Sequence, residues 1–244
     1  MGNTSGDMDS IVGAMGLAYF LTLKNKELWT PVVNCAKADL TLKTEIYCHL
    51  INDCGLSVEE MFFWDELTSK PRSVSEIALI DHNLLDETQA AQLGADAHSK
   101  VQYVYDHHVD NKFYKDIKDY QVRFIGSACS LLVLLMKNNV DLFPKEEMQK
   151  YCYFVAAAVM LDTHNFKELL RDSKWQKEDQ EAHEWLLQYT ELGADYFDKM
   201  QDNKFNQQIA LSFGLQGNFR RDYKTYKLKK GDAAGKFGCA VMVF

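Results

Sequence analysis

The chain has 244 residues, of which 47% are hydrophobic and 25% charged, a composition typical of one large globular domain or one domain and part of a second. Its formal net charge of −8 argues against nucleic acid as a partner, because proteins that bind it neutralise phosphates with Lys and Arg. A small anionic substrate is not excluded, since a bound metal ion supplies positive charge locally.

The sequence shows no segment suited to a membrane or to secretion. Its apolar runs stay below the roughly 20 residues that a membrane-spanning helix needs. The first residues lack the basic stretch, apolar core and cleavage site of a secretory signal. The 6 cysteines form no C-x-x-C pair and are typical of reduced, buried thiols. We therefore expect a cytoplasmic protein without a membrane partner.

The first predicted elements are helix, strand and helix. Residues 10–24 are apolar on almost every side, which predicts a buried helix. Residues 30–35, TPVVNC, are typical of a short strand. Residues 42–55 have the apolar spacing of an amphipathic helix, and Gly55 is expected to end it.

The middle of the chain repeats this alternation. Residues 76–83 and 100–108 are apolar runs that end in polar side chains, as buried strands do. Residues 86–94 begin with an acid and end with glycine, which predicts a helix. Mostly helical stretches follow at 126–139 and 145–166, and residues 175–215 are expected to be wholly helical. The pattern predicts an α/β fold in which helices cover both faces of a parallel sheet.

The chain changes character near residue 217. Residues 218–236 carry seven basic residues against two acidic ones, and a new strand pattern begins within them. We predict a catalytic domain at 1–204, a linker at 205–221 and the beginning of a second α/β domain at 222–244. The last residues stop inside a strand pattern, and only Met1 precedes a turn that normally follows a strand, so we expect a fragment or a misplaced start.

Acids and histidines stand where the predicted apolar segments reach one edge of the sheet. Ligands of an open parallel sheet bind at the carboxyl ends of its strands, and a helix starting there directs its positive amino end to the same place. The residues concerned are Asp7, Asp9, Asp81, Asp106, His107, His108 and Asp162. We expect them to converge.

Carboxylates packed together repel one another unless a cation lies between them. Oxygen ligands with an imidazole suit Mg²⁺ or Mn²⁺, and the sequence offers no cysteine cluster for Zn²⁺. The number of carboxylates exceeds the number of protein ligands that one Mg²⁺ usually binds. We therefore predict two ions about 3.5–4 Å apart, bridged by shared carboxylates.

Each residue alone has a plainer structural interpretation. Asp7 can cap the first helix, Asp9 can favour its dipole, and His108 can be a core histidine. His49 has no acidic partner nearby in sequence and is assigned no role. The remaining histidines are interpreted as structural: His82, His98, His164 and His183.

The series GNTSGDMDS, LIDHN, YDHHVD, GSACS and LDTHNF resembles the DHH phosphoesterase superfamily, whose four acidic motifs come in this order. The resemblance covers residues 2–166 by motif, and the helical region to 215 is compatible with it. Within the superfamily the chain is most similar to cytosolic exopolyphosphatases, with family II inorganic pyrophosphatases and prune-like proteins as relatives. Asn3 stands where family II pyrophosphatases have histidine, and its carboxamide oxygen is a harder ligand that favours Mg²⁺. The letters IDHN at the second motif argue against the prune-like branch.

The resemblance implies metal ligands at Asn3, Asp7, Asp9, Asp81, His107 and Asp162. Asp7 would bind one ion, Asp9 the other, and Asp81 both. His107 and Asp162 would complete the shell of the second ion.

The resemblance also implies groups that act on substrate. His108 would face a substrate phosphate as hydrogen-bond donor or proton source, and Asp106 would orient an imidazole. Ser127, at a predicted helix start, would help to hold a ligand or phosphate. A DHHA2-like second domain would close over the site, and its residues expected to grip substrate are Arg220, Arg221 and Lys224.

The function that the resemblance implies is that of a metal-dependent exopolyphosphatase, which releases orthophosphate from the ends of inorganic polyphosphate through a water activated by two ions. The alternatives are an inorganic pyrophosphatase of the same superfamily and a prune-like phosphodiesterase or scaffold, which the full set of acidic ligands disfavours. Without the remainder of the closing domain, we expect this chain to bind metal but to turn over slowly or not at all. Its oligomeric state stays open.

Overall fold

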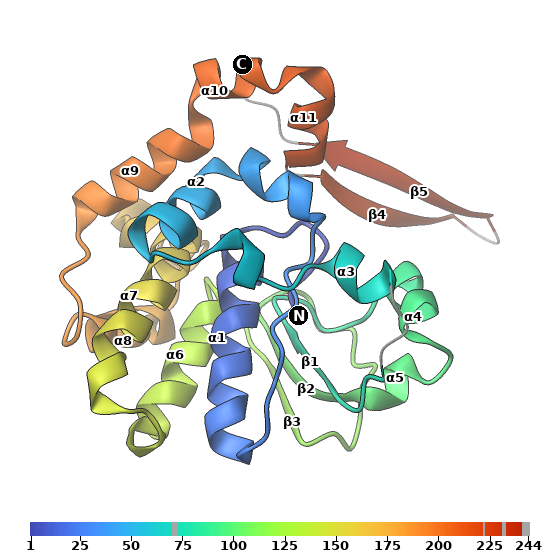
Figure 1. Ribbon diagram of the computed structural model, residues 1–244, viewed down its shortest axis with the longest axis horizontal. Helices are drawn as coiled ribbons and strands as arrows, with labels where there is room; N and C mark the ends of the chain where they lie inside the picture. The colour runs from blue at the N-terminus through green and yellow to red at the C-terminus, as the bar shows by residue number, and fades with distance from the viewer. Residues whose placement is uncertain (70–72, 222, 231–232, 241–244) are drawn as a thin grey trace.

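The structure, a computed structural model, describes residues 1–69, 73–221, 223–230 and 233–240, the last two ranges by their backbone (Figure 1). Its main sheet has three parallel strands: β1 (Ile77–Ile80), β2 (Val101–Asp106) and β3 (Asp119–Val122). They lie in the order β1-β2-β3, with Ile80 beside Tyr105 and Asp106 beside Val122. The predicted α/β class is confirmed, and the carboxyl ends of β1 and β2 lie at the same edge.

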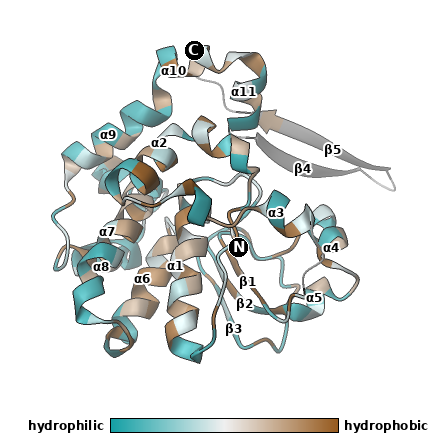
Figure 2. Ribbon diagram, viewed as in Figure 1, coloured by the Kyte–Doolittle hydropathy of each residue, from teal (hydrophilic) through white to brown (hydrophobic). Residues whose placement is uncertain are grey.

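Helices cover both faces of this sheet. On one face, α1 (Met8–Asn25) and α6 (Ala128–Asn138) pack against Ala78, Ile80 and Tyr105, and α7 (Lys145–Asp162) packs against both helices. On the other face, α4 (Glu87–Leu93) and α5 (Ala97–Lys100) cover a smaller cluster that includes Leu79 and Val104. The apolar colour in Figure 2 is accordingly concentrated on the strands and on the helices that face them.

The first helix is the centre of the core. Phe20 and Leu21 of α1 are fully buried, as the prediction of a buried helix at 10–24 required. Gly13 allows α1 to lie close to β1, because a Cβ there would come within 2.9 Å of Cδ1 of Ile80. The Tyr151 hydroxyl of α7 donates a hydrogen bond to the carbonyl of Gly16 at 2.7 Å. These contacts fix the start of α1 beside the strand ends.

The later helices form an outer layer: α8 (Lys177–Leu186), α9 (Ala194–Phe205), α10 (Gln207–Ser212) and α11 (Gly214–Arg221). Continuous helix over 175–215 was therefore a wrong prediction. Residues 187–193 leave the helical path, and Thr190 and Leu192 are buried there. The expected linker at 205–221 is mostly helical. β4 (Tyr223–Lys230) and β5 (Ala233–Ala240) then form an antiparallel hairpin that projects from the end of α11 (Figure 1). The domain boundary itself stays a prediction.

Three local predictions need correction. Residues 30–35 form no strand, because only Val33 pairs, in a lone bridge to Phe63. β3 was missed because its four residues are only half-buried and lack an apolar run. The helix expected at 42–55 is α2 (Thr44–Tyr47) followed by a π-helical segment (Cys48–Asp53). Gly55, whose φ is +70°, follows its end.

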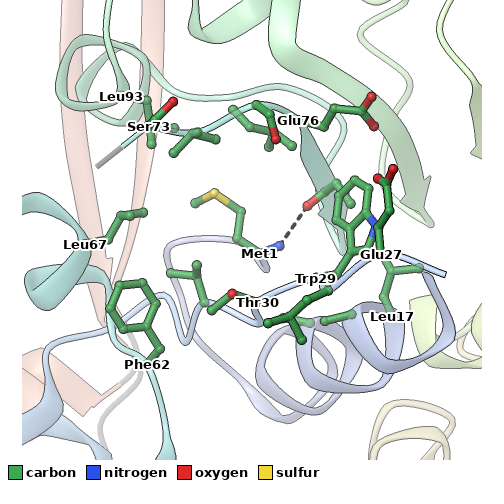
Figure 3. Close-up of a pocket in the computed structure, with 18 residues that line it drawn as sticks. Met1, Leu17, Glu27, Trp29, Thr30, Phe62, Leu67, Ser73, Glu76 and Leu93 are labelled. Carbon is green, nitrogen blue, oxygen red and sulfur yellow. Dashed lines mark hydrogen bonds between the residues drawn. The ribbon is translucent and has the colours of Figure 1, made fainter. Parts of the chain in front are cut away.

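A cavity of about 580 Å³ lies along the outer edge of β1 (Figure 3). Met1 lies at its centre, where its amino group donates to the Ala78 carbonyl at 2.7 Å and its carbonyl accepts from the Ile80 amide at 3.1 Å. Burial lowers the pKa of this amino group to about 5. Trp29 and Phe62 form part of the walls. The described residues that line the cavity include none of the predicted site residues.

In the ranges described above, every helix is too short or too polar to cross a membrane.

Replacing Phe20 by alanine tests the packing on which the site rests. Phe20 is fully buried and stacks on Phe143, with ring centroids 6.3 Å apart. We expect Phe20→Ala to lower the free energy of unfolding by about 3–5 kcal/mol, because it leaves a cavity in the core. Urea unfolding followed by circular dichroism measures this loss. Leu169→Ala, at a side chain 95% exposed, is the control and should change stability by less than about 0.5 kcal/mol; equal effects would contradict the assignment of the core.

Candidate metal centre

The carboxyl ends of β1 and β2 meet the amino end of α1 and the carboxyl end of α7. Two groups of side chains there place possible ligand atoms within 4.8 Å of one another. One group is Asp81, Asp106, His107 and His108, and the other is Asp9, His107 and Asp162. The structure thus brings six of the predicted residues together, and His107 belongs to both groups.

Asp9 is held by the amino end of α6. Its carboxylate is fully buried and accepts hydrogen bonds from the Ser127 hydroxyl at 2.6 Å, the Ala128 amide at 2.6 Å and the Cys129 amide at 2.9 Å. The first amides of a helix lack partners within it and favour an anion. Ser127 also caps α6 and is fully buried, so its observed contact with the site is through Asp9.

Asp81 follows β1 with a φ of +61°, a backbone region that aspartate tolerates better than most residues. One carboxylate oxygen lies 3.1 Å from Nε2 of His107. The other accepts from the Ser10 hydroxyl at 2.5 Å and from the Asn3 amide group at 2.7 Å. The carboxylate is therefore fixed from three sides.

Negative charge is in excess among these buried groups. Burial, and then the charge of Asp7, raises the pKa of Asp81 to about 7. Burial and the charges of Asp9 and Asp7 raise the pKa of Asp162 well above its usual range. Burial alone would lower the pKa of His107, but its hydrogen bond to Asp81 and the nearby carboxylates raise it to about 11. Groups that retain protons in this way fit a divalent cation, and their oxygen-rich donor set suits Mg²⁺ or Mn²⁺.

The first motif folds as a tight turn before α1. Asp7 is the N-cap of α1 and accepts from the Ser10 amide at 3.1 Å, which is the capping role left open by the sequence. Its other oxygen accepts from the Ser5 hydroxyl at 2.9 Å. The Asn3 side-chain oxygen accepts from the Ser5 amide at 2.8 Å, while its nitrogen donates to Asp81. Both predicted ligands therefore lie beside Asp81, and their metal roles stay predictions.

Asp106 and His108 form a pair at the end of β2. Asp106 is fully buried and lies 2.8 Å from Nδ1 of His108, whose side chain is 51% exposed. Although burial alone would raise it, hydrogen bonds from His108 and Asn83 hold the pKa of Asp106 below its usual value. The bond to Asp106 raises the pKa of His108. Asp106 thus orients an exposed imidazole at the rim of the site.

Two polar residues were quoted with their motifs but given no role. Ser10, which follows Asp9, donates to Asp81. Asn83, in the motif LIDHN, donates to Asp106 and to the carbonyl of Val109, and its oxygen accepts from the Asn111 amide at 2.9 Å. Their place within acidic motifs was the signal that could have identified them.

The structure does not bring the predicted basic residues to the acidic cluster. Arg220 is paired with Asp39. Arg221 is 7% exposed, and its guanidinium donates to the Thr44 hydroxyl and to main-chain carbonyls at the end of α9. The Arg221 carbonyl accepts from the ammonium of Lys43 at 2.9 Å. The side chain of Lys224 lies outside the described residues.

Lys43 itself is 4% exposed and also donates to the carbonyl of Ser5 at 2.6 Å. It therefore joins the turn of the first motif to Arg221, the last residue of α11.

His49, which was assigned no role, lies between the Tyr196 hydroxyl and the Phe154 carbonyl, at 2.6 and 2.9 Å, within the protein.

Residues 1–161 match the family model described as "DHH family, N-terminal domain". The chain belongs to the DHH family. Among named relatives, exopolyphosphatase PRUNE1 of Mus musculus is 25% identical over 232 residues, and that of Homo sapiens is 24% identical over 235 residues. Each match covers 92% of this chain and 48% of the relative, so the chain spans about half the length of the curated relatives it matches. Because these relatives are named PRUNE1, a prune-like protein is again a candidate, although the letters IDHN in the second motif argued against it.

This DHH family chain also resembles a solved structure, a putative family II inorganic pyrophosphatase of Methanococcus jannaschii. The TM-score is 0.61 with 20% sequence identity, over 93% of this chain and 66% of the other. At that identity the likeness shows the shared fold. It agrees with the three-stranded parallel sheet and the helices around it.

The pKa of Asp81 predicts how metal-free stability depends on pH. Its pKa of about 7 in the folded state lies above the ordinary value of 3.8 for aspartate, so the folded state keeps a proton that the unfolded state has released. This stabilisation is present below pH 4 and is lost as the pH rises to about 7. A rise of about three pH units, at about 1.4 kcal/mol each, makes the loss at most about 4 kcal/mol.

Urea unfolding in EDTA at pH 5 and pH 8 measures this effect. Asp81→Asn, which cannot titrate, should lose less stability between the two pH values than the wild type does. The comparison cancels the contributions of titrating groups that do not interact with Asp81. Identical pH dependence in the two proteins would show that Asp81 is already ionised at low pH.

Proposed function

We propose that this chain is a metal-dependent phosphoanhydride hydrolase that releases orthophosphate from the ends of inorganic polyphosphate. The observation that carries the proposal is the convergence of Asp9, Asp81, His107 and Asp162 from four separate segments, with possible ligand atoms within 4.8 Å inside each group. Relatives named exopolyphosphatase support the substrate class.

Two divalent ions, Mg²⁺ or Mn²⁺, fit this arrangement better than one. Asp9, His107 and Asp162 form one group of possible ligands, and Asp81 belongs to the other, in which Asp106 is already engaged by His108. Asn3 donates to Asp81 and the charge of Asp7 acts on Asp81, so both would add ligands for the ion that lies away from Asp9 and Asp162. When bound, such ions supply positive charge that polarises phosphate oxygens and makes hydroxide available near neutral pH.

The chain's own residues would then act in distinct ways. Asp81, fixed by Ser10 and Asn3, would present its carboxylate to both ions. His108 would hold a proton and donate it, or a hydrogen bond, to a phosphate oxygen, because Asp106 engages its Nδ1 and leaves Nε2 for substrate. Ser127 would act by keeping Asp9 in place.

The second domain belongs to the proposal as well. We infer that residues 222–244 belong to a DHHA2-like domain, and that the exposed Arg220 and the basic residues after it contribute to substrate binding. Arg221 would serve as the anchor of this region, since its side chain is bonded within the fold. The protein would act in the cytoplasm on a small anion, without nucleic acid.

An inorganic pyrophosphatase is the second candidate, because the protein shares its fold with a putative family II member. Asn3 in the first motif favours the exopolyphosphatase. A prune-like scaffold would need neither the buried carboxylates nor a metal.

Hydrolysis assays on the purified chain test the proposal. Orthophosphate release from long-chain polyphosphate and from pyrophosphate is measured side by side with Mg²⁺ or Mn²⁺, and we expect polyphosphate to be the better substrate. Asp81→Asn should lower the rate at least about 100-fold, because it removes charge from the metal site. Asp198→Asn, at an exposed position of α9, is the matched control and should leave the rate unchanged.

Faster release from pyrophosphate would favour the pyrophosphatase. Full activity in Asp81→Asn, or phosphate release that does not depend on a divalent ion, would refute the metal mechanism. Retained binding of a protein partner by an inactive Asp81→Asn would separate a scaffold role from catalysis.

A further inference from the structure

Asp179 lies in the first turn of α8 and, like Asp9, reaches the amino end of α6. Its side chain is fully buried. One oxygen accepts from the Gly126 amide at 2.7 Å and from the Gln176 amide at 2.7 Å, and the other faces the Ser127 amide at 3.2 Å. One carboxylate thus binds the turn before α6 and caps α8.

Four consecutive amides at the start of α6 are divided between two buried carboxylates. The amides of Gly126 and Ser127 donate to Asp179, and those of Ala128 and Cys129 donate to Asp9. These amides belong to consecutive residues, and only two rotatable dihedrals separate one planar peptide group from the next, so a displacement of one amide is passed on to its neighbour. The direction in which Ser127 and Ala128 point at Asp9 therefore depends on how Asp179 holds the preceding amides.

This turn has little room to relax. A Cβ at Gly126 would lie 2.3 Å from the carbonyl oxygen of Lys174 and 3.1 Å from a carboxylate oxygen of Asp179. Trp175, next to Lys174, is 2% exposed. Because the turn is pressed against the segment that leads into α8, a change at Asp179 must displace the amides rather than be absorbed by solvent.

We propose that Asp179 is a positioning residue of the metal centre, which orients the turn at 126–129 so that it presents the Asp9 carboxylate to a divalent ion. The inference rests on the proposed function for the identity of that ion. Asp179 does not touch the ion or the substrate and acts through Gly126 and Ser127. The alternative is that it only caps α8, in which case metal affinity would not depend on it.

Calorimetric titration of the full chain with Mn²⁺ distinguishes the two. In Asp179→Asn an amide NH₂ replaces an oxygen that now accepts hydrogen bonds, so the turn must shift. We expect the dissociation constant for Mn²⁺ to rise about 10-fold, as for other groups that orient a metal ligand. Glu181→Gln is the matched control: it weakens the Lys137–Glu181 pair of 2.9 Å, which also joins α6 to α8 but lies on the surface. It should change the constant less than about twofold.

A double-mutant cycle adds a measurement that a purely structural role would not affect. If Asp179 acts on Asp9 through Ser127, the effects of Asp179→Asn and Ser127→Ala on Mn²⁺ affinity are coupled and do not multiply. Melting temperatures are recorded in parallel. A lower melting temperature with an unchanged Mn²⁺ constant, or independent effects in the cycle, would overturn the proposal.

A second variant covers the case in which Asp179→Asn does not fold. Glu at this position keeps the capping interaction with Gln176 but displaces the carboxylate by one methylene group from Gly126 and Ser127. Asp179→Glu should therefore fold and still bind Mn²⁺ more weakly; wild-type affinity would contradict the inference. The readout is metal affinity rather than turnover, so the slow turnover expected of this chain does not affect the test, and phosphate release that does not depend on a divalent ion would refute the proposed function alone. A wild type that binds no Mn²⁺ would overturn both.

Discussion

Excess negative charge in a buried place is the constraint on which the rest of this structure depends. Asp9, Asp81 and Asp106 are almost inaccessible to solvent, and their charges lie within reach of one another. Water cannot screen them, so the fold must provide protons, amide groups or cations. Without metal, Asp81 and His107 offset the negative charge by keeping protons, as their raised pKa values indicate. A bound divalent ion would offset the same charge.

The fold meets part of the demand with oriented backbone. Asp7 caps α1, and Asp9 occupies the amino end of α6, so two helix dipoles point their positive ends at the acidic groups. Neither helix could do so without the sheet, which places the carboxyl ends of β1 and β2 at the edge that both helices approach. Core packing therefore also determines the electrostatics of the site, since the burial of α1 sets the positions of Asp7, before the helix, and Asp9, in its first turn.

The sequence predicted which acids and histidines converge better than it predicted the elements around them. Convergence of Asp81, Asp106 and Asp9 followed from a general property of parallel sheets and needed no knowledge of side-chain contacts. β3 was not predicted because a half-buried edge strand has no apolar run. Residues 30–35 were wrongly predicted as a strand because an apolar run can be buried without pairing with another strand. The partners of Ser10 and Asn83 lie 71 and 23 residues away, and no local pattern encodes contacts of that kind.

Lys43 shows how far the influence of one side chain extends. Its ammonium bonds to carbonyls of Ser5 and Arg221, which lie 38 and 178 residues away along the chain. Lys43 therefore ties the turn that holds Asn3 and Asp7 to the carboxyl end of α11, so a displacement at either place strains a hydrogen bond of the same buried ammonium group.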